Sequence, residues 1–77
     1  MEEKEKNKRL YYNYGKVFGH AVSSTSPDKA YILALERVNK LLWKSSMSQD
    51  RKQELMDAFL KGVTETLTSI MEEEVEH

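Results

Sequence analysis

Apolar residues recur at spacings of three and four along most of the chain, and two serine-rich breaks divide this pattern into three segments. The breaks are SSTSP at 23–27 and SSMS at 45–48. We therefore predict helices near 5–23, 27–44 and 49–74. The expected fold class is all-α, either a three-helix bundle or a helical homodimer with a long C-terminal helix.

The second predicted helix has the clearest start. Ser26 is placed as the N-cap, Pro27 as the first helical residue and Asp28 in the first turn, where the helix dipole favours negative charge. The apolar positions that follow at spacings of three and four are Ala30, Tyr31, Ala34, Leu35, Val38, Leu41 and Leu42. Because Ile32, Leu33 and Trp43 widen this apolar surface, we expect the helix to be central and to be contacted on more than one side.

The third predicted helix has a long apolar stripe, made of Leu55, Phe59, Val63, Leu67 and Ile70. Its start is open between Ser46, three residues before Gln49 as in a capping box, and Ser48 alone. The helix is longer than a compact core of this size is expected to cover. We therefore expect its far end, TSIMEEEVEH, to project or to pack on another subunit.

The segment 10–22 has two readings. As a helix it places Leu10, Tyr14, Val17, Phe18 and Ala21 on one face. As a hairpin with a turn at Gly15-Lys16, it leaves neither side cleanly apolar, so the pattern favours the helix. In a helix, Gly15 and Gly19 either allow a second helix to approach closely or merely leave room for the neighbouring tyrosines.

Length and charge indicate one small domain covering residues 1–77. Residues 1–9 are almost wholly charged and predict a frayed tail or solvated helical turns, while 72–77 form an acidic end. Eight basic and five acidic residues lie in 1–40, against four basic and eight acidic in 41–77. A core this thin gains from a partner or a second copy, so we expect a homo-oligomer, a dimer.

The absence of cysteine excludes a disulfide scaffold and a thiolate metal site. No apolar run reaches the roughly 18 residues needed to span a bilayer, and no signal-peptide pattern follows the charged N-terminus. We therefore expect a cytoplasmic protein that does not enter a membrane.

The sequence contains no recognisable set of catalytic residues. The only histidines are His20 and His77, and no arrangement of a nucleophile with a base is recognisable around them. Carboxylates such as Glu54 and Asp57 share a helix face, but paired carboxylates need an enclosed cleft to work as acid and base. We predict that the chain is not an enzyme and has no cofactor and no metal site.

Aromatic side chains are the best functional clue, because Trp, Tyr and Met are enriched at protein interfaces. We predict a protein-binding module, an inhibitor or adaptor that modulates another protein. The residues expected to contact the partner are Tyr11, Tyr12, Tyr14, Phe18, Leu42 and Trp43. In overall type, though in no specific motif, the chain resembles the small accessory proteins encoded by phages, plasmids and bacterial operons.

Nucleic-acid binding is the alternative. Basic side chains surround the tyrosines of the N-terminal segment, where they would neutralise phosphates while the rings stack on bases. The basic residues are Lys6, Lys8, Arg9 and Lys16. Acidic residues within the same tail and a pI near 6.1 make this reading weaker than protein binding.

Overall fold

The computed structural model describes the backbone of residues 2–76 and the side chains of residues 5–73. This part of the chain forms three helices and no strand: α1 (Glu2–Ala21), α2 (Pro27–Trp43) and α3 (Gln49–Glu76). The all-α prediction with a long C-terminal helix is confirmed. The hairpin alternative for 10–22 is wrong, because α1 runs without a break through Gly15 and Lys16.

The helix starts follow from capping serines. The Ser26 side chain accepts a hydrogen bond from the Lys29 backbone N–H at 3.4 Å, and Pro27 begins α2. The Ser48 hydroxyl accepts one from the Arg51 backbone N–H at 3.2 Å, so Ser48 is the cap of α3 rather than Ser46. Both caps satisfy backbone donors that the first helical turn leaves without a partner.

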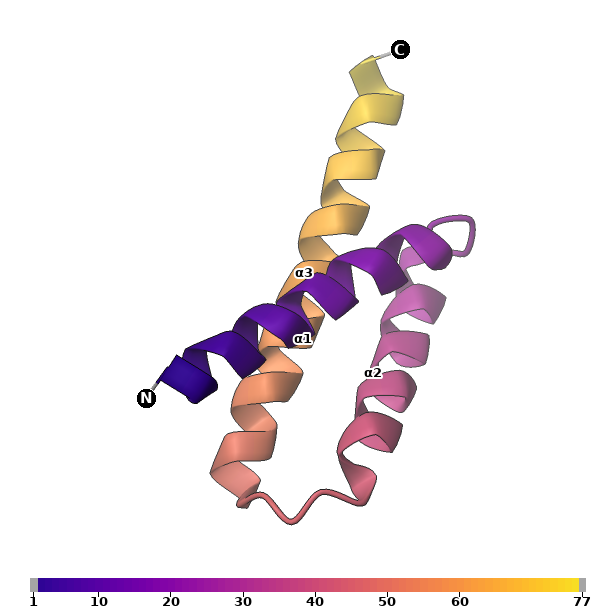
Figure 1. Cartoon of the computed structure of the whole chain (residues 1–77). Helices are drawn as coiled ribbons and strands as arrows, with labels where there is room; N and C mark the ends of the chain where they lie inside the picture. The colour runs from indigo at the N-terminus through magenta and orange to yellow at the C-terminus, as the bar shows by residue number, and fades with distance from the viewer. Residues whose placement is uncertain (1, 77) are drawn as a thin grey trace.

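The arrangement is an antiparallel pair with a third helix laid across it. α2 and α3 run side by side in opposite directions, and α1 crosses α3 diagonally (Figure 1). α1 packs far more extensively on α3 than on α2. The far end of α3 extends beyond both other helices, which gives the molecule its elongated dimensions of 45 × 24 × 16 Å.

The core is a thin layer between α2 and α3. Its fully buried apolar cluster consists of Ala34, Val38, Leu42, Leu55, Phe59 and Val63. These positions follow the spacings of three and four along the two helices, as expected for one buried stripe on each. Among residues with described side chains, no buried side-chain nitrogen or oxygen lacks a hydrogen-bond partner.

Glycine residues lie at the contact between α1 and α3 where the two helices cross. Gly15 and Gly19 of α1 and Gly62 of α3 are all buried, and side chains or backbone of the opposite helix occupy the space next to each. The close approach of two helices, one of the two readings of these glycines, is therefore confirmed. Within residues 2–76, no helix combines the length and apolar character needed to cross a membrane.

Candidate protein-binding surface

α1 turns an apolar stripe away from the helix on which it packs. We call it the outer stripe, and it consists of Leu10, Tyr14, Val17 and Ala21. The exposed fractions of its larger members are 44% for Leu10, 47% for Tyr14 and 69% for Val17. At 3.6 residues per turn, the stripe lies on nearly the opposite side of α1 from the glycines that contact α3. Packing on glycine thus leaves the apolar face open.

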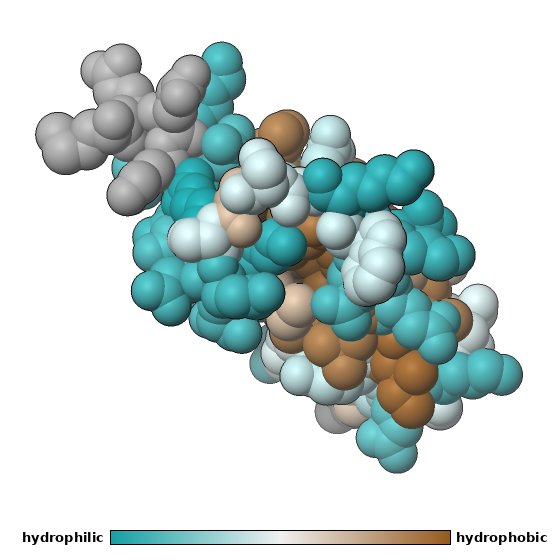
Figure 2. Space-filling model, turned by 90° about the horizontal axis from the view of Figure 1, so that it is seen from below, coloured by the Kyte–Doolittle hydropathy of each residue, from teal (hydrophilic) through white to brown (hydrophobic). Residues whose placement is uncertain are grey.

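A hollow separates this stripe from α2, and we call it the α1–α2 groove. It has a volume of about 300 Å³ and is lined by Tyr14, Val17, Phe18, Ala21, Arg37, Leu41 and Phe59. Leu41 is 45% exposed, so both sides of the groove contribute accessible apolar surface. Seen from below, the molecule shows apolar side chains gathered in a band with hydrophilic side chains around it (Figure 2). An exposed apolar surface with a polar margin is typical of an interaction site.

Two phenylalanines form the floor of the groove. The ring centroids of Phe18 and Phe59 are 5.7 Å apart with the rings tilted by 46°, which fixes Phe18 against the core. The guanidinium carbon of Arg37 lies 5.7 Å from the Phe18 ring centroid, within range of a cation–π interaction. The groove therefore has an aromatic base and a cation at its α2 side.

The groove continues into a second hollow of about 340 Å³ nearer the α1–α2 loop. The two hollows share Phe18 and Arg37, and the second is further lined by Val22, Leu33, Glu36 and Lys40. The two hollows therefore lie next to each other along α2, and charged side chains of both signs, Glu36, Arg37 and Lys40, stand at their margin.

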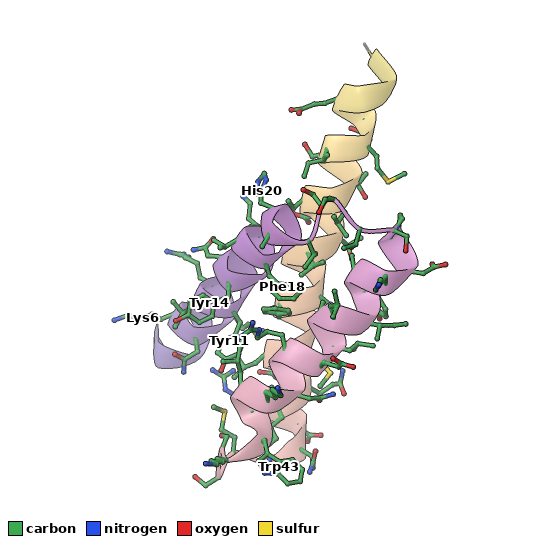
Figure 3. All side chains as sticks on the ribbon, turned by 90° about the vertical axis from the view of Figure 1, so that its right-hand side faces the viewer. Lys6, Tyr11, Tyr14, Phe18, His20 and Trp43 are labelled. Atoms are coloured by element: carbon green, nitrogen blue, oxygen red, sulfur yellow. The ribbon has the colours of Figure 1, made fainter. Side chains whose placement is uncertain are left out.

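Of the tyrosines predicted to contact a partner, Tyr14 is the one that lies in the groove. Tyr11 is half-buried against the core cluster, and its ring meets that of Tyr14 edge-on at a centroid distance of 5.8 Å (Figure 3). Burial raises the pKa of Tyr11 above its usual value, and the neighbouring Tyr14 adds to the effect. Tyr11 thus supports the exposed ring of Tyr14 from inside.

Tyr12 lies on the other side of α1, at the crossing with α3. Its hydroxyl donates a hydrogen bond to the Glu65 carboxylate, and the Lys16 ammonium nitrogen lies 5.4 Å from its ring centroid. The hydrogen bond to Glu65, followed by burial and the carboxylate charge, raises the pKa of Tyr12. Its interactions are therefore within the chain and away from the groove.

The neighbouring residues Leu42 and Trp43 have opposite environments. Leu42 is only 3% exposed and belongs to the core, although it also lines the hollow beside Trp43, so its role as a contact residue stays a prediction. Trp43 is 80% exposed at the end of α2 (Figure 3). It lines a separate hollow of about 440 Å³ with residues from the start of α3, away from the α1–α2 groove. The structure therefore does not unite Trp43 with Tyr14 and Phe18.

Five groove residues were absent from the predicted contact set, namely Val17, Ala21, Arg37, Leu41 and Phe59. Val17 and Leu41 were assigned to the apolar faces of their helices, because their spacing matches the other apolar positions. Nothing in the sequence indicated that Arg37 would line a groove, because a single charged residue in an amphipathic helix usually faces solvent. Only the position of α1 relative to α2 brings Val17, Arg37 and Leu41 together.

The basic residues of the nucleic-acid alternative do not gather into one uniform surface. Lys6, Arg9 and Lys16 are exposed and Lys8 is half-buried. Lys16 shares a polar hollow of about 290 Å³ with Glu65 and Glu73, whose carboxylates would repel phosphate.

His20 lines the same polar hollow from the end of α1. No group of three or more His, Cys, Asp or Glu side chains suited to a metal ion is found in the described part of the chain, which does not include His77.

The chain matches no protein-family model, and comparisons with curated proteins and with solved structures find no significant match.

Proposed function

We propose that this chain is a non-enzymatic protein-binding module, an inhibitor or adaptor, whose α1–α2 groove receives an amphipathic helix of another protein. The observation that carries the proposal is the orientation of α1. Because α1 packs on α3 through glycine, Leu10, Tyr14 and Val17 remain accessible beside an aromatic-floored groove. Exposed apolar residues arranged at helical spacing are suited to a helix-in-groove contact.

The charges of the three helices indicate which charge the partner helix is expected to have. α1 and α2 together contain eight basic and five acidic residues, whereas α3 contains three basic and eight acidic. Arg37 lines the groove, and Lys40 lines the adjoining hollow together with Glu36. The partner helix is therefore expected to have an apolar stripe with acidic residues beside it, because such charges would steer the encounter and set its orientation.

The test is a capture experiment with the tagged chain in a lysate of the source cells, in parallel with and without nuclease. A Val17→Glu variant places a charge in the groove, and Thr64→Glu places the same charge on an exposed position of α3 as the matched control. Support requires one protein that survives nuclease treatment, is lost with Val17→Glu and is retained by Thr64→Glu. Capture that depends on nucleic acid, or that is unaffected by Val17→Glu, overturns the proposal.

Trp43→Ala forms an additional arm, because Trp43 lies in a different hollow from the groove residues. We expect this variant to capture the same partner as the unmodified chain. Loss of the partner with Trp43→Ala but not with Val17→Glu would move the binding surface to the end of α2.

A further inference from the structure

The apolar stripe of α3 continues past the region that the chain itself covers. Phe59 and Val63 are buried, Leu67 and Ile70 are half-buried, and Met71 is 52% exposed. α3 has 28 residues against 20 in α1 and 17 in α2, so it is longer than either by more than two turns. Its far end projects alone beyond the crossing (Figure 1). The apolar stripe of α3 therefore becomes more exposed to solvent toward the C-terminal end of the helix.

The solvent-accessible surface area of the chain is larger than that expected for a compact monomer of the same mass. The chain exposes 5950 Å², whereas the size relation for compact monomers gives roughly 4,850 Å² for a mass of 9.0 kDa. The excess of about 1,100 Å² is comparable to the roughly 800 Å² that each partner contributes to a standard protein interface. A second copy is a partner of sufficient size to bury it.

The two uncovered surfaces are complementary in charge and in polarity. The projecting end of α3 presents Met71 beside Glu72 and Glu73, which are exposed. The groove presents apolar surface beside Arg37, and the adjoining hollow adds Lys40 and Glu36, so that cations outnumber the one carboxylate there. Two α3 ends placed against each other would bring acidic clusters together, whereas an α3 end in the groove brings carboxylates to cations.

We propose that the chain forms a homodimer in which the projecting end of α3 from each copy docks in the α1–α2 groove of the other. The contact is reciprocal, so a two-fold axis closes it and leaves no free groove or free α3 end. This inference rests on the proposed function in using the same groove. It adds that a partner helix must displace the end of α3, which makes the dimer the form in which the binding surface is covered.

The first test is the molar mass in solution, measured by sedimentation equilibrium over a range of micromolar concentrations. We expect a dimer that dissociates as salt rises, because the proposed charge pairs lie near the surface. The double reversal Arg37→Glu/Lys40→Glu, and separately Glu72→Lys/Glu73→Lys, should each weaken dimerisation by about tenfold or more. Combining all four substitutions in one chain should restore the dimer, since the charges are then exchanged.

The second test identifies which surfaces meet. The chain has no cysteine, so single cysteines placed at Val17 and Met71 report one pair of positions without background. Mixing Val17→Cys with Met71→Cys chains under oxidising conditions should give a disulfide-linked pair. Mixing Thr64→Cys with Val17→Cys provides the control, because Thr64 is exposed but lies on the earlier part of α3.

The following results would contradict the proposed homodimer. A monomer at every concentration overturns the inference but leaves the proposed function intact, because an open groove is then free for another protein. A dimer in which Val17→Cys chains link to one another, or in which charge exchange does not restore association, also overturns it. Circular dichroism of each variant confirms that the exposed substitutions keep the helices folded.

Discussion

Gly62 of α3 faces Gly15 of α1 at the crossing of the two helices, and neither position has room for a side chain. A Cβ atom on Gly62 would lie 3.2 Å from the carbonyl carbon of Gly15 and would collide with the carbonyl oxygen of Tyr12. A Cβ atom on Gly15 would collide with the carbonyl oxygen of Phe59. The obstacles are backbone atoms, which cannot rotate away as a side chain does.

Gly15→Ala is therefore expected to lower the free energy of unfolding by about 2 kcal/mol or more, because the two helices must move apart and lose contacts along their length. This loss exceeds the roughly 1 kcal/mol by which alanine favours a helix over glycine. Urea denaturation followed by circular dichroism gives the comparison. Gly62→Ala should behave in the same way.

Gly19→Ala provides a graded control at the same crossing. Its Cβ would lie 2.9 Å from Cβ and 3.0 Å from Cγ2 of Thr66 and 3.3 Å from the carbonyl oxygen of Val63, so the overlap with backbone is smaller than at Gly15. Because Thr66 Cβ is attached to the backbone and cannot rotate away, we expect Gly19→Ala to lower the free energy of unfolding, but by less than Gly15→Ala. If Gly15→Ala instead stabilised the chain, as it would at an open helical position, the close crossing would be wrong.

Leu42 and Trp43 allow a second prediction with an internal control. Leu42→Ala removes a buried side chain from the core cluster and should lower the free energy of unfolding by about 2–5 kcal/mol. Trp43→Ala removes a larger but exposed side chain and should change it by less than about 0.5 kcal/mol. Denaturation of the two variants side by side measures the difference. Equal losses would contradict the exposed position of Trp43.

The sequence predicted the elements and the α2–α3 core better than it predicted the surface. Ser26 and Pro27 marked the start of α2, and the stripe through Phe59 and Val63 marked the buried face of α3. Caps and periodicity are local properties, so they can be read without knowing how the helices meet.

The buried face of α1 was not predictable in the same way. Periodicity assigns burial to the face with the most apolar area, which on α1 is the face of Tyr14 and Val17. The structure instead buries Gly15 and Gly19, because close packing of backbone against backbone gains many small dispersion contacts that a hydropathy pattern does not record. The candidate groove exists because α1 buries its glycine face and leaves the face of Tyr14 and Val17 exposed.

Leu42 shows the same limit on a smaller scale. Leu41, Leu42 and Trp43 are consecutive apolar residues, and successive side chains point about 100° apart around a helix. Their sequence alone does not say which of them meets α3. The register of α2 against α3 places Leu42 inside and leaves Trp43 outside.

The cap of α2 gives a third prediction. Ser26→Ala removes the acceptor of the Lys29 backbone N–H and should lower the free energy of unfolding by about 1 kcal/mol. Ser24→Ala, in the same loop and also exposed, is the matched control and should have little effect. Thermal denaturation of both variants measures the loss. An equal change in the two would show that the Ser26 hydroxyl does not contribute as a cap.

The contact between Tyr12 and Glu65 predicts a dependence of stability on alkaline pH. The hydrogen bond raises the pKa of Tyr12 above its ordinary value of 10.0 in the folded chain, so the folded state holds this proton more tightly than the unfolded state. The stabilisation is fully present below pH 10.0 and is lost as the pH rises through the raised pKa. The unmodified chain should therefore lose stability in this range more steeply than Tyr12→Phe. Tyr11, whose pKa is raised by burial, is present in both chains, so the difference between their unfolding curves isolates Tyr12. Parallel curves for the two chains from neutral to alkaline pH would mean that the hydroxyl of Tyr12 is not held by Glu65.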